Sequence, residues 1–130
     1  MALLDDLSDY LTSAGTTTPI NKGWFFSTAD RVLCLRGTGG FPSHHVMNPA
    51  VNQAILEEPT LQLLARATTY DQAEATARSA KSLLDGLRKR TINSVVYHWA
   101  TAMQPPFFLE RDENQRFVFA MNVQLKRQTV

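Results

Sequence analysis

The clearest periodic stretch of the chain is Phe-Val-Phe-Ala-Met-Asn-Val-Gln-Leu-Lys, at residues 117–126. Large apolar side chains occupy every second position from Phe117 to Leu125, with small or polar residues between most of them. Because successive side chains of a strand point to opposite faces of a sheet, this pattern predicts a strand with one buried face. The polar turn at 111–115 precedes it, so we expect an antiparallel hairpin here.

Working outward, short apolar and β-branched runs predict further strands. They lie at residues 24–26, 32–36, 60–67 and 95–103. Pro105 and Pro106 break the last run, and the apolar residues 107–109 follow them. Residues 38–53 are rich in Gly, Pro, Ser, His and Asn and show no periodicity. They predict a long loop, which in so small a domain usually has a function.

Two segments have the periodicity of helices. Residues 2–14 place leucines three and four positions apart, and Gly15 follows as a stop signal. Thr69 and Gln72 form a capping box that opens a second helix. One stripe of that helix carries apolar side chains. Its members are Tyr70, Ala73, Ala77, Ala80, Leu84 and Leu87.

The order of these elements predicts one domain over residues 1–130, since the length leaves no room for a second core. A helix lying between two strands permits a crossover connection, so the sheet can be mixed or mainly antiparallel. Two helices packed on one face of this sheet give a two-layer α+β fold.

The charge balance indicates what the protein does not bind. Thirteen Lys and Arg oppose twelve Asp and Glu, a net charge of +1, which argues against a protein specialised for nucleic-acid phosphates. The acids at the N-terminus and the bases of 71–90 are either solvated faces or patches that attract each other between copies. Cys34 lies in an apolar run and is expected to be a small buried residue. No stretch has the length of a signal peptide's apolar core or of a membrane span.

Candidate catalytic and metal sites are weak. His44 and His45 are adjacent and lack the further ligands that a metal needs. The Gly37–Gly40 segment lacks the remaining features of a phosphate-binding turn. Paired carboxylates lie in polar turns, where nothing separates their pKa values for acid–base work. We therefore expect no enzyme activity, no cofactor and no metal.

Surplus apolar residues favour self-association instead. Residues 107–109 are apolar behind two stiffening prolines, more than one small core requires. The long loop is the natural arm for a second kind of contact. The interface residues that we predict are Phe41, His44, His45, Met47, Phe107, Phe108, Leu109 and Arg111.

Several blocks of the sequence, in order, resemble the bacteriophage minor-capsid and tail-terminator family. They are Leu-Leu-Asp-Asp-Leu-x-x-Tyr-Leu at 3–11, Thr-Gly-Gly-Phe-Pro at 38–42, Tyr-Asp-Gln-Ala-Glu-Ala at 70–75, Leu-Leu-Asp-Gly-Leu at 83–87 and Gln-Pro-Pro-Phe-Phe-Leu-Glu-Arg-Asp-Glu-Asn at 104–114. The chain departs from the family at Gln115, where a Gly commonly completes the turn. We expect Asn114 to supply the left-handed backbone there instead.

The resemblance implies a non-enzymatic virion protein of the tail or neck, assembled in the cytoplasm of the host bacterium. Similar proteins form a six-subunit ring that caps the tail tube, stops its growth and presents a surface to the head connector or a head-completion protein. Viral DNA would pass through the lumen without sequence-specific binding, and no membrane is involved. Two alternatives stay open: another neck protein, such as a head-completion or tube-like subunit, and a small nucleic-acid or ligand-binding domain.

Overall fold

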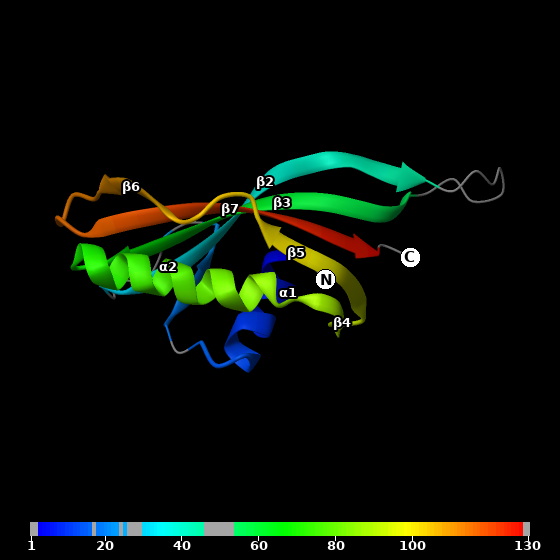
Figure 1. Ribbon diagram of the computed structural model, residues 1–130, viewed down its shortest axis with the longest axis horizontal. Coiled ribbons are helices and arrows are strands. Elements are labelled where there is room, and N and C mark those ends of the chain that lie inside the picture. The colour runs from blue at the N-terminus through cyan, green and yellow to red at the C-terminus, as the bar shows by residue number, and fades with distance from the viewer. Residues whose placement is uncertain (1–2, 17, 24, 26–29, 46–53, 129–130) are drawn as a thin grey trace.

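A computed structural model describes residues 3–16, 18–23, 25, 30–45 and 54–128, with the backbone alone at 41–45 and 54–55. The elements, in chain order, are α1 (Leu3–Ser13), β1 (Ile20–Lys22), β2 (Val32–His45), β3 (Ala54–Ala67), α2 (Tyr70–Asp85), β4 (Arg88–Ile92), β5 (Val95–Ala102), β6 (Phe107–Arg111) and β7 (Phe117–Gln128). One mixed sheet has the order β1-β2-β3-β7-β5-β4, and β6 also pairs with β7. Both helices lie on the same side of this curled sheet (Figure 1). The predicted α+β fold is confirmed.

Strand β7 organises the sheet. It pairs antiparallel with β3 along one edge, from Leu56↔Gln128 to Ala67↔Phe117. Along its other edge it pairs first with β6 and then with β5. The alternation seen in the sequence is explained by this position. Met121, Val123 and Leu125 are fully buried beneath the helices.

Strands β5 and β6 are successive pieces of one interrupted edge. Ala102 of β5 is opposite Val123, and Phe107 of β6 is opposite Ala120. Four residues, 103–106, therefore lie opposite only two residues of β7. Pro105 and Pro106 have no N–H to donate to the ladder, which is why the pairing stops here. The antiparallel hairpin predicted around the polar turn at 111–115 is confirmed as β6–β7.

Helix α2 packs through its small residues. Thr69 is its N-cap, and the Thr69 hydroxyl accepts a hydrogen bond from the Gln72 amide at 3.2 Å. The alanines of the predicted stripe and Leu84 are buried against the sheet, and Leu87 is buried just beyond the helix end. Tyr70 belongs to the same predicted stripe, but its side chain is 45% exposed. As the first residue of the helix, it lies at the edge of the core, against the rings of Phe117 and Phe119.

Polar contacts of the α1 acids help to hold the helix on the sheet. Asp6 is fully buried, and its carboxylate accepts hydrogen bonds from the Tyr97 hydroxyl at 2.5 Å and the Asn93 amide at 2.9 Å. Burial and the neighbouring Asp6 raise the pKa of Tyr97 well above its ordinary value. Asp5 pairs with Lys22, and Asp9 accepts from Asn93. The N-terminal acids are thus engaged within the fold.

The predicted loop at 38–53 is wrong over residues 38–45, which belong to a strand. β2 continues to His45 and pairs with β3 down to Ala54. Register shifts between Gly37 and Gly39 and between Phe41 and His44 mark bulges, which hide strand periodicity in the sequence. Gly40 has φ +148°, and a Cβ there would lie 2.5 Å from the Glu58 carbonyl oxygen. Residues 46–53 of the predicted loop lie outside the described residues.

Three smaller expectations also need correction. The strand predicted at 24–26 is not present at Phe25, while positions 24 and 26 lie outside the described residues. The strand near this point is β1, parallel to β2. Strand β4 is missing from the sequence prediction, because its Arg-Lys-Arg-Thr-Ile sequence exposes every side chain except Ile92. Gln115 itself takes the left-handed backbone, with φ 64°, so Asn114 does not substitute for it.

Candidate subunit interface

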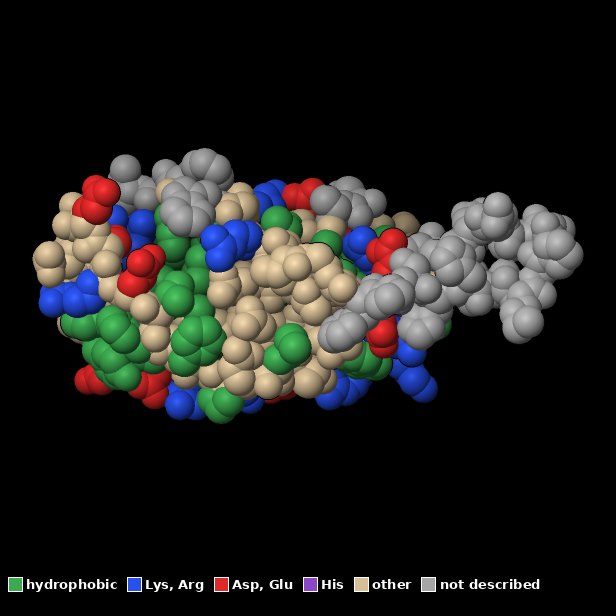
Figure 2. Space-filling model, turned by 90° about the horizontal axis from the view of Figure 1, so that it is seen from above, with side chains coloured by type: hydrophobic (Ala, Val, Ile, Leu, Met, Phe, Trp, Pro, Cys, Tyr) green, Lys and Arg blue, Asp and Glu red, His purple; other side chains and the backbone are tan. Residues whose placement is uncertain are grey.

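The β6 strand presents an apolar surface to solvent. All five residues of β6 are exposed. Phe107, Phe108 and Leu109 are among the few large apolar side chains that the described residues leave exposed. We call these three residues and Tyr70 the β6 patch, in which Phe108 lies with Tyr70 on the helix side of the sheet and Phe107 and Leu109 lie on the other side. In the view from above, apolar side chains gather at this end of the molecule, with charged groups around them (Figure 2).

An aromatic cluster anchors the β6 patch. The ring of Tyr70 lies edge-on to Phe119, with centroids 4.7 Å apart, and 6.0 Å from the ring of Phe108. Phe108 in turn lies 6.0 Å from both Phe117 and Phe119. Phe119 is buried, so the cluster joins the core to the surface. Aromatic pairs at these spacings attract each other, so two members of the patch, Tyr70 and Phe108, are held by ring contacts within the chain.

The turn after β6 is a hydrogen-bonded unit. Asp112 Oδ1 accepts from the backbone amides of Asn114 and Arg116, and its Oδ2 accepts from Arg116 Nε at 2.7 Å. Burial alone would raise the pKa of Asp112, but the amide and guanidinium of Arg116 hold it below its usual value. Asp112 is thereby committed to the turn, whereas Glu110 and Glu113 are exposed. We call residues 110–113 the acidic turn.

A concavity of about 520 Å³ lies beside this turn, on the sheet face opposite the helices. Arg66 is only 4% exposed there, and its guanidinium lies 4.7 Å from the ring centroid of Phe25. Burial and the nearby Arg116 lower the pKa of Arg66. Cys34, Leu64, Val118 and Ala120 form the small buried cluster of this face. Cys34 is fully buried, as predicted, and its burial raises the pKa of the thiol.

The structure separates the predicted interface residues into two groups. Phe107, Phe108, Leu109 and Arg111 lie together on β6, where the Arg111 guanidinium lies 4.7 Å from the ring centroid of Phe117. Phe41, His44 and His45 lie on β2, beyond β3 and β7 from β6 in the sheet. Met47 lies outside the described residues. The hairpin of β2 and β3 projects from the body of the sheet, and we call it the β2–β3 arm (Figure 1).

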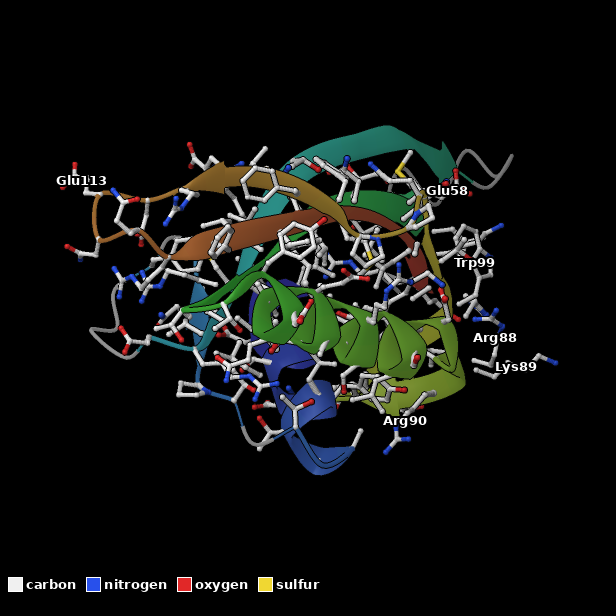
Figure 3. The ribbon with its side chains drawn as sticks, turned by 60° about the vertical axis from the view of Figure 1, so that its left-hand side comes forward. Glu58, Arg88, Lys89, Arg90, Trp99 and Glu113 are labelled. Carbon is white, nitrogen blue, oxygen red and sulfur yellow. The ribbon has the colours of Figure 1, made fainter. Side chains whose placement is uncertain are left out.

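Sequence reasoning missed a second exposed surface, on β4. Arg88, Lys89 and Arg90 are consecutive and exposed, and the strand register places Arg88 opposite Trp99 and Trp99 opposite Lys126. We call Arg88, Lys89 and Arg90 the basic edge. They and Trp99 lie at the end of the molecule opposite Glu113 (Figure 3). The run of cations was visible in the sequence, but its place on an edge strand beside a tryptophan was not.

The residues that the structure describes meet the requirements of neither a metal site nor a membrane-spanning helix. Within them, no three His, Cys, Asp or Glu side chains are grouped as a metal site requires. None of the described helices combines the length and apolar character needed to cross a membrane.

Comparison with known proteins identifies the family. Residues 10–129 match the sequence model described as "Bacteriophage tail terminator protein". The chain belongs to this family. It is therefore a structural protein of the phage tail or neck, and the predicted family relationship is confirmed. No curated protein sequence matches the chain.

The fold of this tail terminator family member is similar to that of a solved virion chain. The matching chain comes from a structure titled "Virion of native gene transfer agent (GTA) particle", with a TM-score of 0.69 and 10% sequence identity. The alignment covers 98% of this chain and 95% of that chain. At this identity the likeness establishes a shared fold along the whole chain.

Proposed function

We propose that the protein forms a hexameric ring that caps the phage tail tube, ends its polymerisation and joins the tail to the head connector. Membership of the tail terminator family supports the role, and the exposed β6 patch supports self-association. Terminating a tube requires a subunit with one face that copies a tube contact and another that cannot extend it. The ring is a virion component, formed in the host cytoplasm.

The β6 patch is the observation that carries the proposal. Three adjacent large apolar side chains on one strand of a small domain favour association with another surface, because their burial removes apolar area from water. The patch needs little ordering on binding, since Phe108 is already held among Tyr70, Phe117 and Phe119. Preorganisation of this kind lowers the entropic cost of association.

The β2–β3 arm suits an axial contact with the tail tube protein or with a connector or head-completion protein. It projects away from the core, and its sheet direction is reset by the bulges near Gly40. Phe41, His44 and His45 lie on this arm and Met47 follows in sequence. A contact made by the arm is independent of one made by the β6 patch, so the two functions are separable by mutation.

The lumen of the ring would pass viral DNA without sequence-specific binding and without enzymatic chemistry or a cofactor. A net charge of +1 gives each subunit little overall attraction for the DNA backbone.

The test is imaging and native mass spectrometry of the purified protein, alone and with isolated tail tubes. We expect multimers of the 14.6 kDa chain that bind tube ends. Phe108→Asp should abolish multimers while leaving a folded monomer, because it introduces a charge into the β6 patch. Thr101→Asp, on an exposed position of neighbouring β5, adds the same charge and should leave assembly intact.

A phage lacking the protein should accumulate over-long tails or tails that never join heads. Normal tail length and head joining in its absence would exclude the terminator role. Rings that bind heads but never tube ends would favour a head-completion subunit instead.

A further inference from the structure

We propose that the basic edge on β4 is the surface that receives the β6 patch and acidic turn of the next copy in the ring. This inference rests on the proposed ring, and it identifies the second of the two surfaces that the ring interface requires. A closed ring of identical subunits uses a head-to-tail interface, in which two different surfaces of the same chain meet. The β6 patch is one surface, so a second must lie elsewhere on the molecule.

The location of the basic edge suits this role. β6 pairs with the beginning of β7, at Phe117–Ala120, whereas β5, which carries β4, pairs with its end, at Val123–Arg127. The acidic turn and the basic edge therefore lie toward opposite ends of β7. Figure 3 shows Arg88 and Lys89 extending from one end and Glu113 from the other. Neither surface can contact the other within one subunit.

Among the described residues, the charges of the basic edge are only partly offset, by the electrostatic interaction of Arg88 with Asp85. In the described part of the chain, no carboxylate lies within ion-pair distance of Lys89 or Arg90. The Arg88 guanidinium donates to the carbonyls of Leu87 and Ala100, and Arg90 lies 5.0 Å from the ring centroid of Tyr10. Lys89 has neither kind of anchor among the described residues, so its ammonium is available to a partner.

The opposite end offers what these cations bind. Glu110 and Glu113 are exposed and make no ion pair within the described residues, whereas Asp112 is held by Arg116. Arg111 reduces the negative charge of the turn, but it lies over Phe117. The exposed rings of Tyr70, Phe107 and Phe108 add cation–π partners, which bind Lys and Arg at their faces. Acids and aromatic rings together fit a cationic partner.

The backbone of the basic edge supports a role beyond folding. Lys89 has φ 45°, a conformation that a side chain with a Cβ adopts at some cost. Backbone strain of this kind is concentrated at functional sites. On β4, this backbone conformation changes the direction of the Lys89 side chain relative to its two strand-paired neighbours, Arg88 and Arg90. The outer edge of β4 pairs with no other described strand, so it is open to a neighbour.

Charge reversal with complementation tests the pairing. Lys89→Glu and Glu113→Lys should each raise the concentration needed for half-assembly at least about tenfold at low salt, since like charges would face each other. At about 1 M salt the difference should disappear because the charges are screened. Arg78→Glu is the matched control, an equal charge reversal on the exposed face of α2, and should assemble normally.

A mixture of the two single variants gives the sharpest result. If copies alternate around the ring, the reversed edge of one variant faces the reversed turn of the other, and each unchanged edge faces an unchanged turn. The mixture should therefore reach half-assembly near the wild-type concentration, although each variant alone needs a concentration at least about tenfold higher. The double variant Lys89→Glu/Glu113→Lys should also assemble. Thermal melting of each monomer should match wild type, which separates lost assembly from lost folding.

Three outcomes would overturn the inference. Normal assembly of both single variants at low salt would show that this pair does not meet, while leaving the ring itself intact. Normal assembly of Lys89→Glu with weaker salt-dependent retention on DNA would assign the basic edge to nucleic-acid phosphates. A wild-type protein that stays monomeric with and without tail tubes would remove the ring, and this inference with it.

Discussion

Strands β5 and β6 pair with the same edge of β7, yet one belongs to the core and the other to the surface. On β5, Tyr97 and Ala100 are fully buried beneath the helices, whereas every residue of β6 is exposed. The difference comes from what covers them. Helices α1 and α2 cover the β5 flank. The β6 flank lies beyond the buried positions of α2, where only the first residue of that helix, Tyr70, reaches it. Apolar residues alone therefore do not define the core; the covering helix does.

The comparison predicts the largest loss of stability on the β5 flank. Leu84→Ala should lower the free energy of unfolding by about 2–5 kcal/mol, because it leaves a cavity in a fully buried site. Urea unfolding followed by circular dichroism measures the change. An unchanged midpoint would mean that α2 does not cover this flank as described.

The buried polar contact of the same flank should rank next. Tyr97→Phe removes the hydroxyl that donates to the buried Asp6 carboxylate, so we expect a loss of about 1.5–3 kcal/mol. Tyr10→Phe is the control, because its hydroxyl donates to the neutral Leu83 carbonyl and should cost less, about 0.5–1.5 kcal/mol. Equal losses in the two variants would contradict a special role for Asp6.

On the β6 flank, the turn should contribute a smaller, pH-dependent amount. Asp112→Asn should cost about 1 kcal/mol at neutral pH, because it weakens the acceptor for Arg116. The pKa of Asp112 is lower in the folded chain than its ordinary 3.8, so its carboxylate stabilises the fold above that pH. The contribution is lost as the pH falls through the lowered pKa. The stability gap between wild type and variant should narrow below about pH 4 and stay constant from about pH 6 to 8.

An increase in stability is expected from a substitution at Gln115, in the same turn. Gln115→Gly should raise the free energy of unfolding by about 0.5–1 kcal/mol, because Gln115 has φ 64° and glycine adopts this conformation without a steric penalty. Asn114→Gly is the control and should not stabilise the protein, since Asn114 is absent from the positive-φ residues. A gain at position 114 and none at 115 would reverse the assignment of the left-handed residue.

The smallest effect on folding should come from the patch itself. Leu109→Ser changes a side chain that is 43% exposed, beside a register shift in β6, so monomer stability should move by no more than about 0.5 kcal/mol. The same variant should weaken self-association measured by sedimentation. A large loss of monomer stability would place β6 in the core and remove the contrast with β5.

Much of this contrast could be read from local patterns, and part of it could not. The alternation of 117–125 and the Thr69 cap depend on neighbouring residues, so sequence reasoning found β7 and α2. The continuation of β2 to His45 depends on pairing with β3 across bulges, which no local period reveals. β4 was missed for a related reason, since its strand geometry comes from β5 and only Ile92 turns inward.

The candidate interface was likewise predictable from the sequence only in part. Pro105 and Pro106 before three apolar residues predicted that β6 would be exposed, and the structure agrees. Tyr70 joins the patch through ring contacts with residues far along the chain, which spacing cannot predict. The basic edge required knowing that residues 88–90 lie on an edge strand rather than at the end of a helix.

The close approach at Gly40 makes the pairing of β2 with β3 depend on one glycine. Any side chain at this position would collide with the backbone at Glu58 and Pro59, so the paired stretch between the register shifts requires a glycine that lies outside both buried clusters. A larger residue at this position should therefore displace the pairing of β2 with β3 without removing any buried side chain. The strand that carries Phe41, His44 and His45 thus depends on backbone space at position 40, where a single methyl group is enough to disturb it.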